Sequence, residues 1–367
     1  MDHTQPPPVP SHPTGAPAQP APRRWWPWAL LACALFVGLI FMGLVGLGGM
    51  ASAFVPLEGL EQYQEVTQRR GDGAAKIALI KIQGVITSDS LDGSSRGMVE
   101  RVRDQFALAA RDPNVKAVLL HVDSPGGEVM ASDEIHRAVQ EYRTKTGRPV
   151  ICSMAGMAAS GGYYVAAPCQ FIVAHEISIT GSIGVIMQTV NVHGLMERVG
   201  VRSYTITSGE HKDMLSMFKS PDKIAADGDE KLLRELVDQF YARFKRLVAE
   251  GRSQAKEFNR GQKDPGRPLD AKWTELADGR ILTGQQAYEH GFVDKLGNLD
   301  VAIKEAERLG GITSRATVVR YSAPFDLSSL FRLFVKTPDR RLAVDIGLQL
   351  PRLEPGRPYF LSPLIYK

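Results

Sequence analysis

Two short glycine-rich segments put polar side chains at points where a strand is expected to end and a helix to begin. Residues 123–127 read DSPGG, and residues 158–164 read AASGGYY. Glycine lets the backbone approach a ligand closely, and the first N–H groups of a helix carry partial positive charge. The N–H groups of the paired glycines and of Gly161 could therefore stabilise an oxyanion beside Ser160, whose hydroxyl would be a nucleophile.

Each segment also has a plain structural interpretation. A Pro-Gly-Gly sequence between a strand and a helix is most often only a turn. A serine at the start of a helix commonly caps it, because its hydroxyl accepts a hydrogen bond from a backbone N–H of the first turn. Two such turns in successive strand–helix units favour a catalytic site, but these residues alone leave both interpretations open.

A serine hydroxyl needs a base before it can act as a nucleophile. No histidine has a spacing that indicates a Ser-His-Asp triad. Lysine is the alternative base, because an apolar site poor in water lowers the pKa of its ammonium toward neutral pH. The candidate histidines are His121, His136, His175, His193, His211 and His290.

Strand-like and helix-like segments alternate around these turns. Residues 76–86, 115–122 and 149–154 are rich in β-branched and apolar side chains, which is typical of buried strands. Helical periodicity appears in residues 98–110 and 128–143. The alternation predicts an α/β fold built on a parallel sheet.

Later segments continue this pattern. Residues 171–174, 184–187 and 202–207 are predicted strands, and residues 229–248 are a predicted helix. That helix should turn one apolar face to the core. The face consists of Leu232, Leu236, Phe240, Phe244 and Leu247.

Five separated motifs, in the same order, resemble the short form of the signal peptide peptidase A family, Ser/Lys proteases of peptidase family S49. The resemblance covers about residues 76–309, and the single catalytic unit matches the short form. The motifs are residues 123–127 (DSPGG), 153–166 (SMAGMAASGGYYVA), 180–186 (TGSIGVI), 208–216 (SGEHKDMLS) and 277–294 (ADGRILTGQQAYEHGFVD).

The resemblance implies a role for each matched residue. Ser160 corresponds to the nucleophile, Lys212 to the general base, and Ser182 to the hydroxyl that orients the lysine ammonium. Gly127 and Gly161 correspond to the oxyanion donors. His211 is a rival base, but neighbouring residues on an extended segment face opposite ways, so both cannot address Ser160.

The resemblance also implies a fold and a reaction. The fold would be the crotonase/Clp-protease-like α/β architecture, in which stacked ββα units bring the two glycine-rich turns together. The reaction would be peptide hydrolysis through an acyl-enzyme, with no cofactor and no metal. Two alternatives are a membrane-tethered, non-catalytic scaffold of the same fold and an acyl-CoA-type hydratase or hydrolase; Ser160 and Lys212 argue against the first, and the predicted anchor against the second.

An uncharged apolar stretch near the N-terminus predicts a membrane anchor. Residues 25–57 contain no charge, and residues 28–50 can cross the roughly 30 Å hydrocarbon layer as a helix. Arg23 and Arg24 precede the stretch and Glu58 follows it, so the positive-inside rule places the N-terminus in the cytoplasm. We therefore expect a single-pass protein of the cell (inner) membrane with its catalytic domain outside the cytoplasm.

A cleaved signal peptide ending at Ala53 is the alternative, but the apolar stretch exceeds the usual length for one. Composition and these motifs divide the chain into five parts. They are a disordered Pro-rich cytoplasmic tail (1–24), a transmembrane signal-anchor (25–53), a linker (54–75), a protease domain (76–310) and a C-terminal extension with a possible oligomer contact (311–367).

Composition narrows the class of partner. The 44 basic and 40 acidic residues are interleaved, which argues against nucleic acid, and 44% hydrophobic residues suffice for a core. Cys33 lies in the predicted anchor, and Cys152 and Cys169 are expected to be buried free thiols. The resemblance implies extended apolar peptides such as remnant signal peptides as substrates, the lipid bilayer as a partner, and a homo-oligomeric ring whose neighbours share the serine and the lysine of each site.

Overall fold

The computed structural model describes residues 35–36, 63–88, 97–322 and 358–361. The chain divides into two compact units, residues 1–57 and residues 58–367, and the fold below belongs to the second. The predicted tail, almost all of the predicted anchor and most of the predicted C-terminal extension lie outside the described residues. Among the helices that the structure does describe, none has the length and apolar character needed to cross a bilayer.

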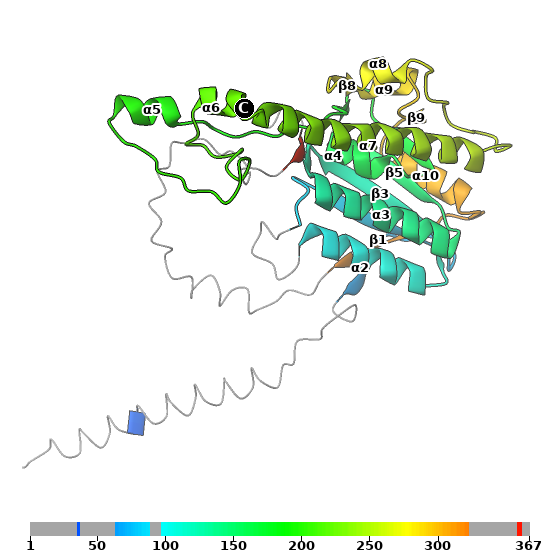
Figure 1. Ribbon diagram of the computed structural model, residues 1–367. Coiled ribbons are helices and arrows are strands. Elements are labelled where there is room, and N and C mark those ends of the chain that lie inside the picture. The colour runs from blue at the N-terminus through cyan, green and yellow to red at the C-terminus, as the bar shows by residue number, and fades with distance from the viewer. Residues whose placement is uncertain (1–34, 37–62, 89–96, 323–357, 362–367) are drawn as a thin grey trace, which may run out of the picture. The chain divides into compact units, whose positions relative to one another are not determined.

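A twisted sheet forms the centre of the second unit (Figure 1). Its nine strands within the described residues follow the order β1-β10-β2-β3-β5-β6-β9, and β7 pairs with both β5 and β8. The strands from β10 to β9 are parallel, and β1 is antiparallel to β10. They are β1 (Gln64–Arg69), β2 (Lys76–Gln83), β3 (Val115–Ser124), β5 (Val150–Ala159), β6 (Phe171–Ala174), β7 (Ile179–Gly181), β8 (Ile281–Thr283), β9 (Lys295–Leu296) and β10 (Thr317–Ser322).

Helices cover both faces of this sheet. Figure 1 shows α2 and α3 side by side across the strands, with the long α7 next to them. The opposite core contains α10 and its apolar contacts. The helices are α2 (Met98–Arg111), α3 (Val129–Thr146), α4 (Gly161–Ala166), α5 (His193–Arg198), α6 (Pro221–Ala226), α7 (Asp229–Phe258), α8 (Trp273–Leu276), α9 (Gly284–Glu289) and α10 (Leu299–Leu309).

The side-chain alternation of β2 explains why both faces need a cover. Ile77 and Leu79 pack in the core beneath α10, whereas Ile80 and Ile82 pack in the core that contains α2 and α3. A strand that is apolar on both faces belongs inside an α/β sheet. The sequence prediction of a parallel sheet with helices on its faces is confirmed.

Two short strands stand apart from the central sheet. Strand β4 (Gly126–Glu128) follows β3 directly and leads into α3, so β3, β4 and α3 form one ββα unit. Strand β11 (Tyr359–Leu361) pairs with β4 in antiparallel fashion. The segment from β4 to α3 thus carries the first glycine-rich turn and also holds a strand from the far end of the chain.

Several predicted boundaries differ from the observed ones. The sheet extends beyond residues 76–310, because β1 and β10 pair with each other and β10 pairs with β2. Within predicted strand 184–187 only Ile186 forms a bridge, and predicted strand 202–207 is not a strand. The latter prediction was wrong because the β-branched residues there pair with no strand among the described residues.

The predicted helix 229–248 is the first part of α7, which continues to Phe258. Its C-terminal half packs as expected, with Phe244 and Leu247 buried. The expectation fails at the N-terminal half, where Leu232 is 40% exposed and Leu236 is 36% exposed. The spacing of apolar residues predicts a helix, but it does not show whether other residues of the same chain bury them.

Candidate active site

The two glycine-rich turns lie against each other at the ends of β3 and β5. A Cβ atom built on Gly126 would lie 2.8 Å from the backbone nitrogen of Gly161. One built on Gly161 would lie 3.0 Å from the backbone nitrogen of Gly127. Since neither gap could hold a side chain, glycine is required here, and the N–H groups of Gly127 and Gly161 lie close together.

Ser160 connects the end of β5 to the start of α4 in an unusual backbone conformation. Its φ is 54° and its ψ is −117°, a region that residues with a side chain rarely adopt. The Ser160 N–H donates to the Gly181 carbonyl at 2.8 Å, and the Tyr164 N–H donates to the Ser160 carbonyl at 2.9 Å. These two bonds hold the strained turn, a type of strain that clusters at functional sites.

The Ser160 hydroxyl is not used as a helix cap. It makes no hydrogen bond to the first turn of α4, and it is buried with no hydrogen-bond partner among the described residues. Buried hydroxyl groups are normally hydrogen-bonded, so an unsatisfied one calls for an explanation. The capping interpretation is therefore excluded for this serine, and its hydroxyl is available for a reaction partner.

Ser182 lies beside Ser160 because β5 and β7 are parallel neighbours. Ala159 pairs with Gly181 at the ends of these strands, and the two serines come next in each. Ser182 is buried, has a φ of 51°, and donates its N–H to the Arg280 carbonyl at 2.7 Å. The structure thus brings together four of the five predicted site residues.

Lys212 is the predicted site residue that the structure does not bring to Ser160. Its side chain is exposed, and its ammonium makes no hydrogen bond or ion pair with any residue in the described ranges. The segment around it is a series of turns, with the Lys212 N–H donating to the Gly209 carbonyl at 3.2 Å. The prediction that His211 and Lys212 lie on an extended segment was therefore wrong.

His211 is occupied elsewhere in this structure. Its Nδ1 lies 2.9 Å from a carboxylate oxygen of Asp229, at the first position of α7. The same carboxylate hydrogen-bonds the ammonium of Lys219. Of the two rival bases, His211 is thus held by a hydrogen bond to Asp229, whereas the Lys212 ammonium has no partner in the described ranges.

A buried lysine organises the loop that carries these two residues. The Lys219 ammonium lies 2.9 Å from Asp213 and 2.7 Å from Asp227, and it also contacts Asp229. Desolvation opposes its charge, but the hydrogen bonds that it donates to the three carboxylates outweigh that cost and raise its pKa. These carboxylates are close enough together to hold a metal ion, but the Lys219 ammonium already lies against all three of them.

A second network of polar side chains connects α3, α4 and α7, and the sequence analysis did not predict it. The Tyr164 hydroxyl donates to Asp133 at 2.7 Å, and Arg243 donates to the same carboxylate oxygen at 2.6 Å and 3.0 Å. The ring of His136 packs against the Tyr164 ring with a centroid separation of 5.5 Å. The sequence signal was weak: one acidic residue on the apolar face of a predicted helix.

His136 is the most deeply buried of the candidate histidines. Neither of its ring nitrogens has a partner among the described residues. Desolvation lowers its pKa to about 4, with nearby arginines adding to the effect and Asp133 opposing it. We therefore interpret His136 as a packing residue, because its imidazole is buried and neutral and its ring contacts Tyr164.

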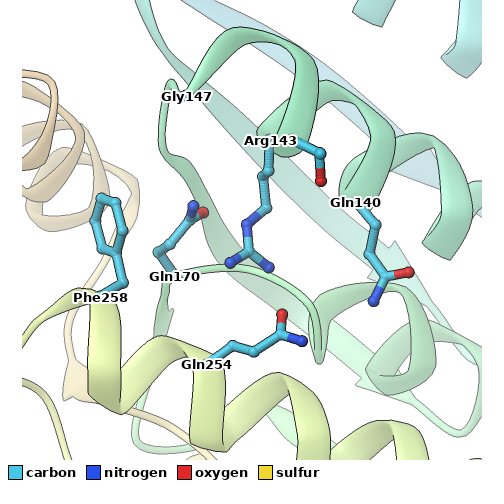
Figure 2. A pocket seen from close by; sticks show the side chains of 7 residues that line it. Gln140, Arg143, Gly147, Gln170, Gln254 and Phe258 are labelled. Atoms are coloured by element: carbon cyan, nitrogen blue, oxygen red, sulfur yellow. The ribbon is translucent and has the colours of Figure 1, made fainter.

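The remaining nucleophiles and cavities lie apart from this site. Cys152 and Cys169 are buried and free, as expected, and burial raises the pKa of the Cys152 thiol, which makes it unreactive. A cavity of about 430 Å³ between α3 and α7, shown in Figure 2, contains none of the predicted site residues. Its lining consists of Gln140, Arg143, Thr144, Gly147, Gln170, Gln254 and Phe258.

Two family models match this chain. The model described as peptidase family S49 matches residues 142–313, which include Ser160, Ser182 and Lys212. The model described as Clp protease matches residues 81–172, which include both glycine-rich turns. The second match supports the predicted Clp-protease-like α/β class.

Two individual relatives support the same family. A putative signal peptide peptidase SppA of Enterococcus faecium is 32% identical over 311 residues, covering 82% of this chain and 84% of the relative. A putative protease of Synechocystis sp. is 36% identical over 237 residues, covering 65% of this chain and 75% of the relative. Among solved structures, a variant of the 1510-N membrane-bound stomatin-specific protease has a TM-score of 0.36 and 18% identity, covering 63% of this chain and 83% of that one.

Proposed function

Since the chain belongs to peptidase family S49, the signal peptide peptidase A family of serine proteases, we propose that it hydrolyses peptides with a Ser160/Lys212 dyad. The neutral Lys212 amine takes the proton of the Ser160 hydroxyl as its oxygen attacks the peptide carbonyl carbon. The N–H groups of Gly127 and Gly161 stabilise the tetrahedral oxyanion. The protonated lysine then gives its proton to the departing amine, and water releases the acyl group from Ser160 by the same steps.

One observation carries this assignment. The Ser160 hydroxyl is buried on a strained turn without a hydrogen-bond partner in the described part of the chain, next to the clustered N–H groups of two glycines that cannot be replaced without a clash. This arrangement destabilises the folded protein when no substrate is bound, because it combines backbone strain with an unsatisfied polar group. Both features are explained if a peptide carbonyl and a base complete the site.

The base is proposed to come from a neighbouring copy of the chain. Lys212 is exposed and unpaired within the described residues, on a segment whose apolar side chains face solvent. Tyr204 is 94% exposed and Ile206 is 88% exposed, and Figure 1 shows α5 and α6 beyond the N-terminal end of α7. Exposed apolar patches of this kind mark interfaces. We call the segment from α5 to α6, residues 193–226, the arm. A homo-oligomeric ring would cover the arm and bring Lys212 to the next subunit's Ser160.

The substrate class and location follow from the family and the N-terminal sequence. A relative named as a putative signal peptide peptidase supports extended apolar peptides, such as remnant signal peptides, as substrates. The uncharged residues 25–57 support a single-pass anchor, with the protease domain outside the cytoplasm at the cell (inner) membrane. A protease anchored in the membrane would act close to such peptides, which are membrane-associated.

Labelling with a fluorophosphonate tests the proposal directly. This reagent forms a covalent bond with an activated serine, and peptide mapping then identifies the residue. The expected result is one label on Ser160, absent in Ser160→Ala. The matched control is Ser153→Ala, since Ser153 is a buried serine of β5, the strand that leads to Ser160, and its hydroxyl contacts His121. Labelling of Ser160→Ala to the wild-type extent would contradict the assignment.

A further inference from the structure

The cavity between α3 and α7 (Figure 2) has a lining rich in hydrogen-bond donors and poor in charge. Its volume of about 430 Å³ falls in the range of about 300–1,000 Å³ that is typical of small-molecule pockets. One water molecule in the liquid occupies only about 30 Å³. Arg143 is the one charged residue in the described lining, and three glutamines line the cavity with it. A cavity of this size and lining can hold an organic ligand with a single charged group.

The Arg143 guanidinium has no carboxylate partner in the described ranges. Its Nη1 donates to the Pro168 carbonyl, whereas its Nε is buried without a hydrogen-bond partner. Desolvation lowers the pKa of Arg143, and no described carboxylate lies close enough to oppose that effect. A largely desolvated guanidinium normally has an opposite charge beside it. An anionic ligand in the cavity would supply that charge.

Another arginine of this chain shows which edge of a guanidinium binds a carboxylate. Arg280 binds both oxygens of Asp278, one through Nε at 2.8 Å and the other through Nη2 at 2.6 Å. Nε and Nη2 of Arg143 are the corresponding pair, and neither donates to a described residue. Two parallel N–H groups of this kind match the two oxygens of a carboxylate. This edge of Arg143 therefore fits a ligand carboxylate.

The amide side chains of the cavity offer the groups that a peptide backbone needs. Figure 2 shows the guanidinium of Arg143 between Gln170 and Gln254, and Gln140 lies one turn before Arg143 on α3. Gln170 accepts the Val150 N–H at 2.8 Å with its Oε1, which leaves its NH₂ group for a ligand. The amides of Gln140 and Gln254 have no partner among the described residues. An amide both donates and accepts hydrogen bonds, as a peptide group does.

Charge and an apolar wall narrow the class of ligand. One guanidinium balances one carboxylate, whereas phosphorylated ligands carry nearly two charges and are bound by clusters of arginines. The ring of Phe258, which is 39% exposed, adds an apolar surface to the lining. A short peptide that ends in an apolar residue offers a carboxylate, peptide groups and an apolar side chain together.

We propose that this cavity binds the free C-terminal carboxylate of a short peptide. Arg143 holds the carboxylate, Gln140 and Gln254 bond the last peptide group, and Phe258 contacts the last side chain. The site is distinct from the catalytic one, since no predicted site residue lines it. The binding rests on the cavity alone. Its use for products rests on the proposed function, because each cleavage gives one product with a new C-terminal carboxylate.

Two peptides that differ only at the C-terminus test the inference. N-acetyl-Ala-Leu is added as the free acid and as the amide to the full-length Ser160→Ala protein, which should not consume the probe. Binding is measured by isothermal titration calorimetry. We expect the acid to bind at least about tenfold more tightly, because hydrogen bonds to a charged group are the stronger kind. Equal affinities of acid and amide, or no binding of either, would overturn the inference.

Substitution of Arg143 shows whether the acid binds in this cavity or in the catalytic cleft. Arg143→Gln should weaken binding of the acid at least about tenfold, so that acid and amide bind alike. Lys145→Gln is the control, because it removes a positive charge from an exposed position of α3 outside the described lining. It should bind the acid as before. Undiminished binding of the acid to Arg143→Gln would contradict the site. The comparison of acid and amide needs no change at Arg143, so it decides the matter even if that variant unfolds.

Two smaller anions test the class of ligand. Acetate has the carboxylate without the peptide group, and inorganic phosphate has charge without an apolar body, so both should bind more weakly than the peptide acid. Binding of either one as tight as that of the peptide would overturn the peptide assignment.

These outcomes are separate from those of the proposed function. Binding of the acid through Arg143 together with failure of fluorophosphonate to label Ser160 would refute the nucleophile and leave the peptide site standing. Normal labelling together with equal affinities of acid and amide would refute the peptide site and leave the nucleophile standing.

Discussion

At the scale of single residues, the site depends on strain that the surrounding strands maintain. The positive φ of Ser160 and of Ser182 costs of the order of 1–3 kcal/mol at each residue. Each serine gives its N–H to a carbonyl in a neighbouring segment, Ser160 to Gly181 and Ser182 to Arg280. These two bonds therefore fix the backbone of both serines before a substrate arrives.

Replacement of Lys212 by arginine separates a base from a mere positive charge. A guanidinium stays protonated at any usable pH, so Lys212→Arg should be as inactive as Lys212→Ala. We expect both to lose at least about 10²–10⁴-fold in peptide hydrolysis, the range for loss of a general base. Lys223→Arg, an exposed lysine of nearby α6, is the control and should keep its activity. Substantial activity in Lys212→Arg would move the role to His211.

The burial of His136 predicts a pH dependence of stability. Its pKa of about 4 in the folded protein lies below the ordinary 6.5, so between these values the unfolded chain binds a proton that the folded chain does not. Stability should therefore fall as the pH is lowered from 6.5 toward 4, by up to about 3 kcal/mol from this residue. Denaturant unfolding at several pH values measures it.

His136→Phe should flatten that part of the profile. The ring nitrogens have no partner within the described residues, so phenylalanine removes the titration without removing a hydrogen bond. His193→Gln, at a partly exposed histidine, should leave the profile unchanged. A profile for His136→Phe as steep as that of the wild type would refute the assignment.

At the scale of elements, α7 joins two different environments. Its C-terminal half packs in the core, whereas Leu232 and Leu236 in its N-terminal half face solvent. The Lys219 cluster, through Asp229, ties the start of α7 to the loop that carries Lys212. Helix α7 is anchored in the core by its C-terminal half and therefore holds the exposed arm in a fixed position. The proposed contact with a neighbouring subunit requires such an arrangement.

Arg252 is the polar anchor of the buried half of α7. Its guanidinium pairs with Asp294, and both side chains are 2% exposed. Arg252→Met should lower the free energy of unfolding by about 3–5 kcal/mol, because it leaves a buried carboxylate without its partner charge. The control is Arg246→Met on the same helix, where an exposed pair with Glu250 at 3.8 Å should be worth less than about 0.5 kcal/mol. Equal losses in denaturant unfolding would contradict this ranking.

At the scale of the whole molecule, the sequence predicted what local patterns encode. Apolar runs located β2, β3, β5 and β6, and residue types located the two glycine-rich turns. Pairing of β10 with β2 depends on segments more than 200 residues apart, which no local periodicity reveals. The three-residue β11 is too short to stand out, and the β-branched residues of the segment 202–207 do not reveal that it is exposed and outside the sheet.

A mixing experiment tests the central claim, that Ser160 and a neighbour's Lys212 form one working site. Ser160→Ala and Lys212→Ala proteins, each of which we expect to be inactive alone, are mixed in equal amounts under conditions of subunit exchange. In a ring with random neighbours, about a quarter of the interfaces pair an intact serine with an intact lysine. The account predicts recovery of about that fraction of wild-type hydrolysis, and none when Ser160→Ala is mixed with the double variant. Persistent inactivity despite demonstrated exchange would contradict the shared site.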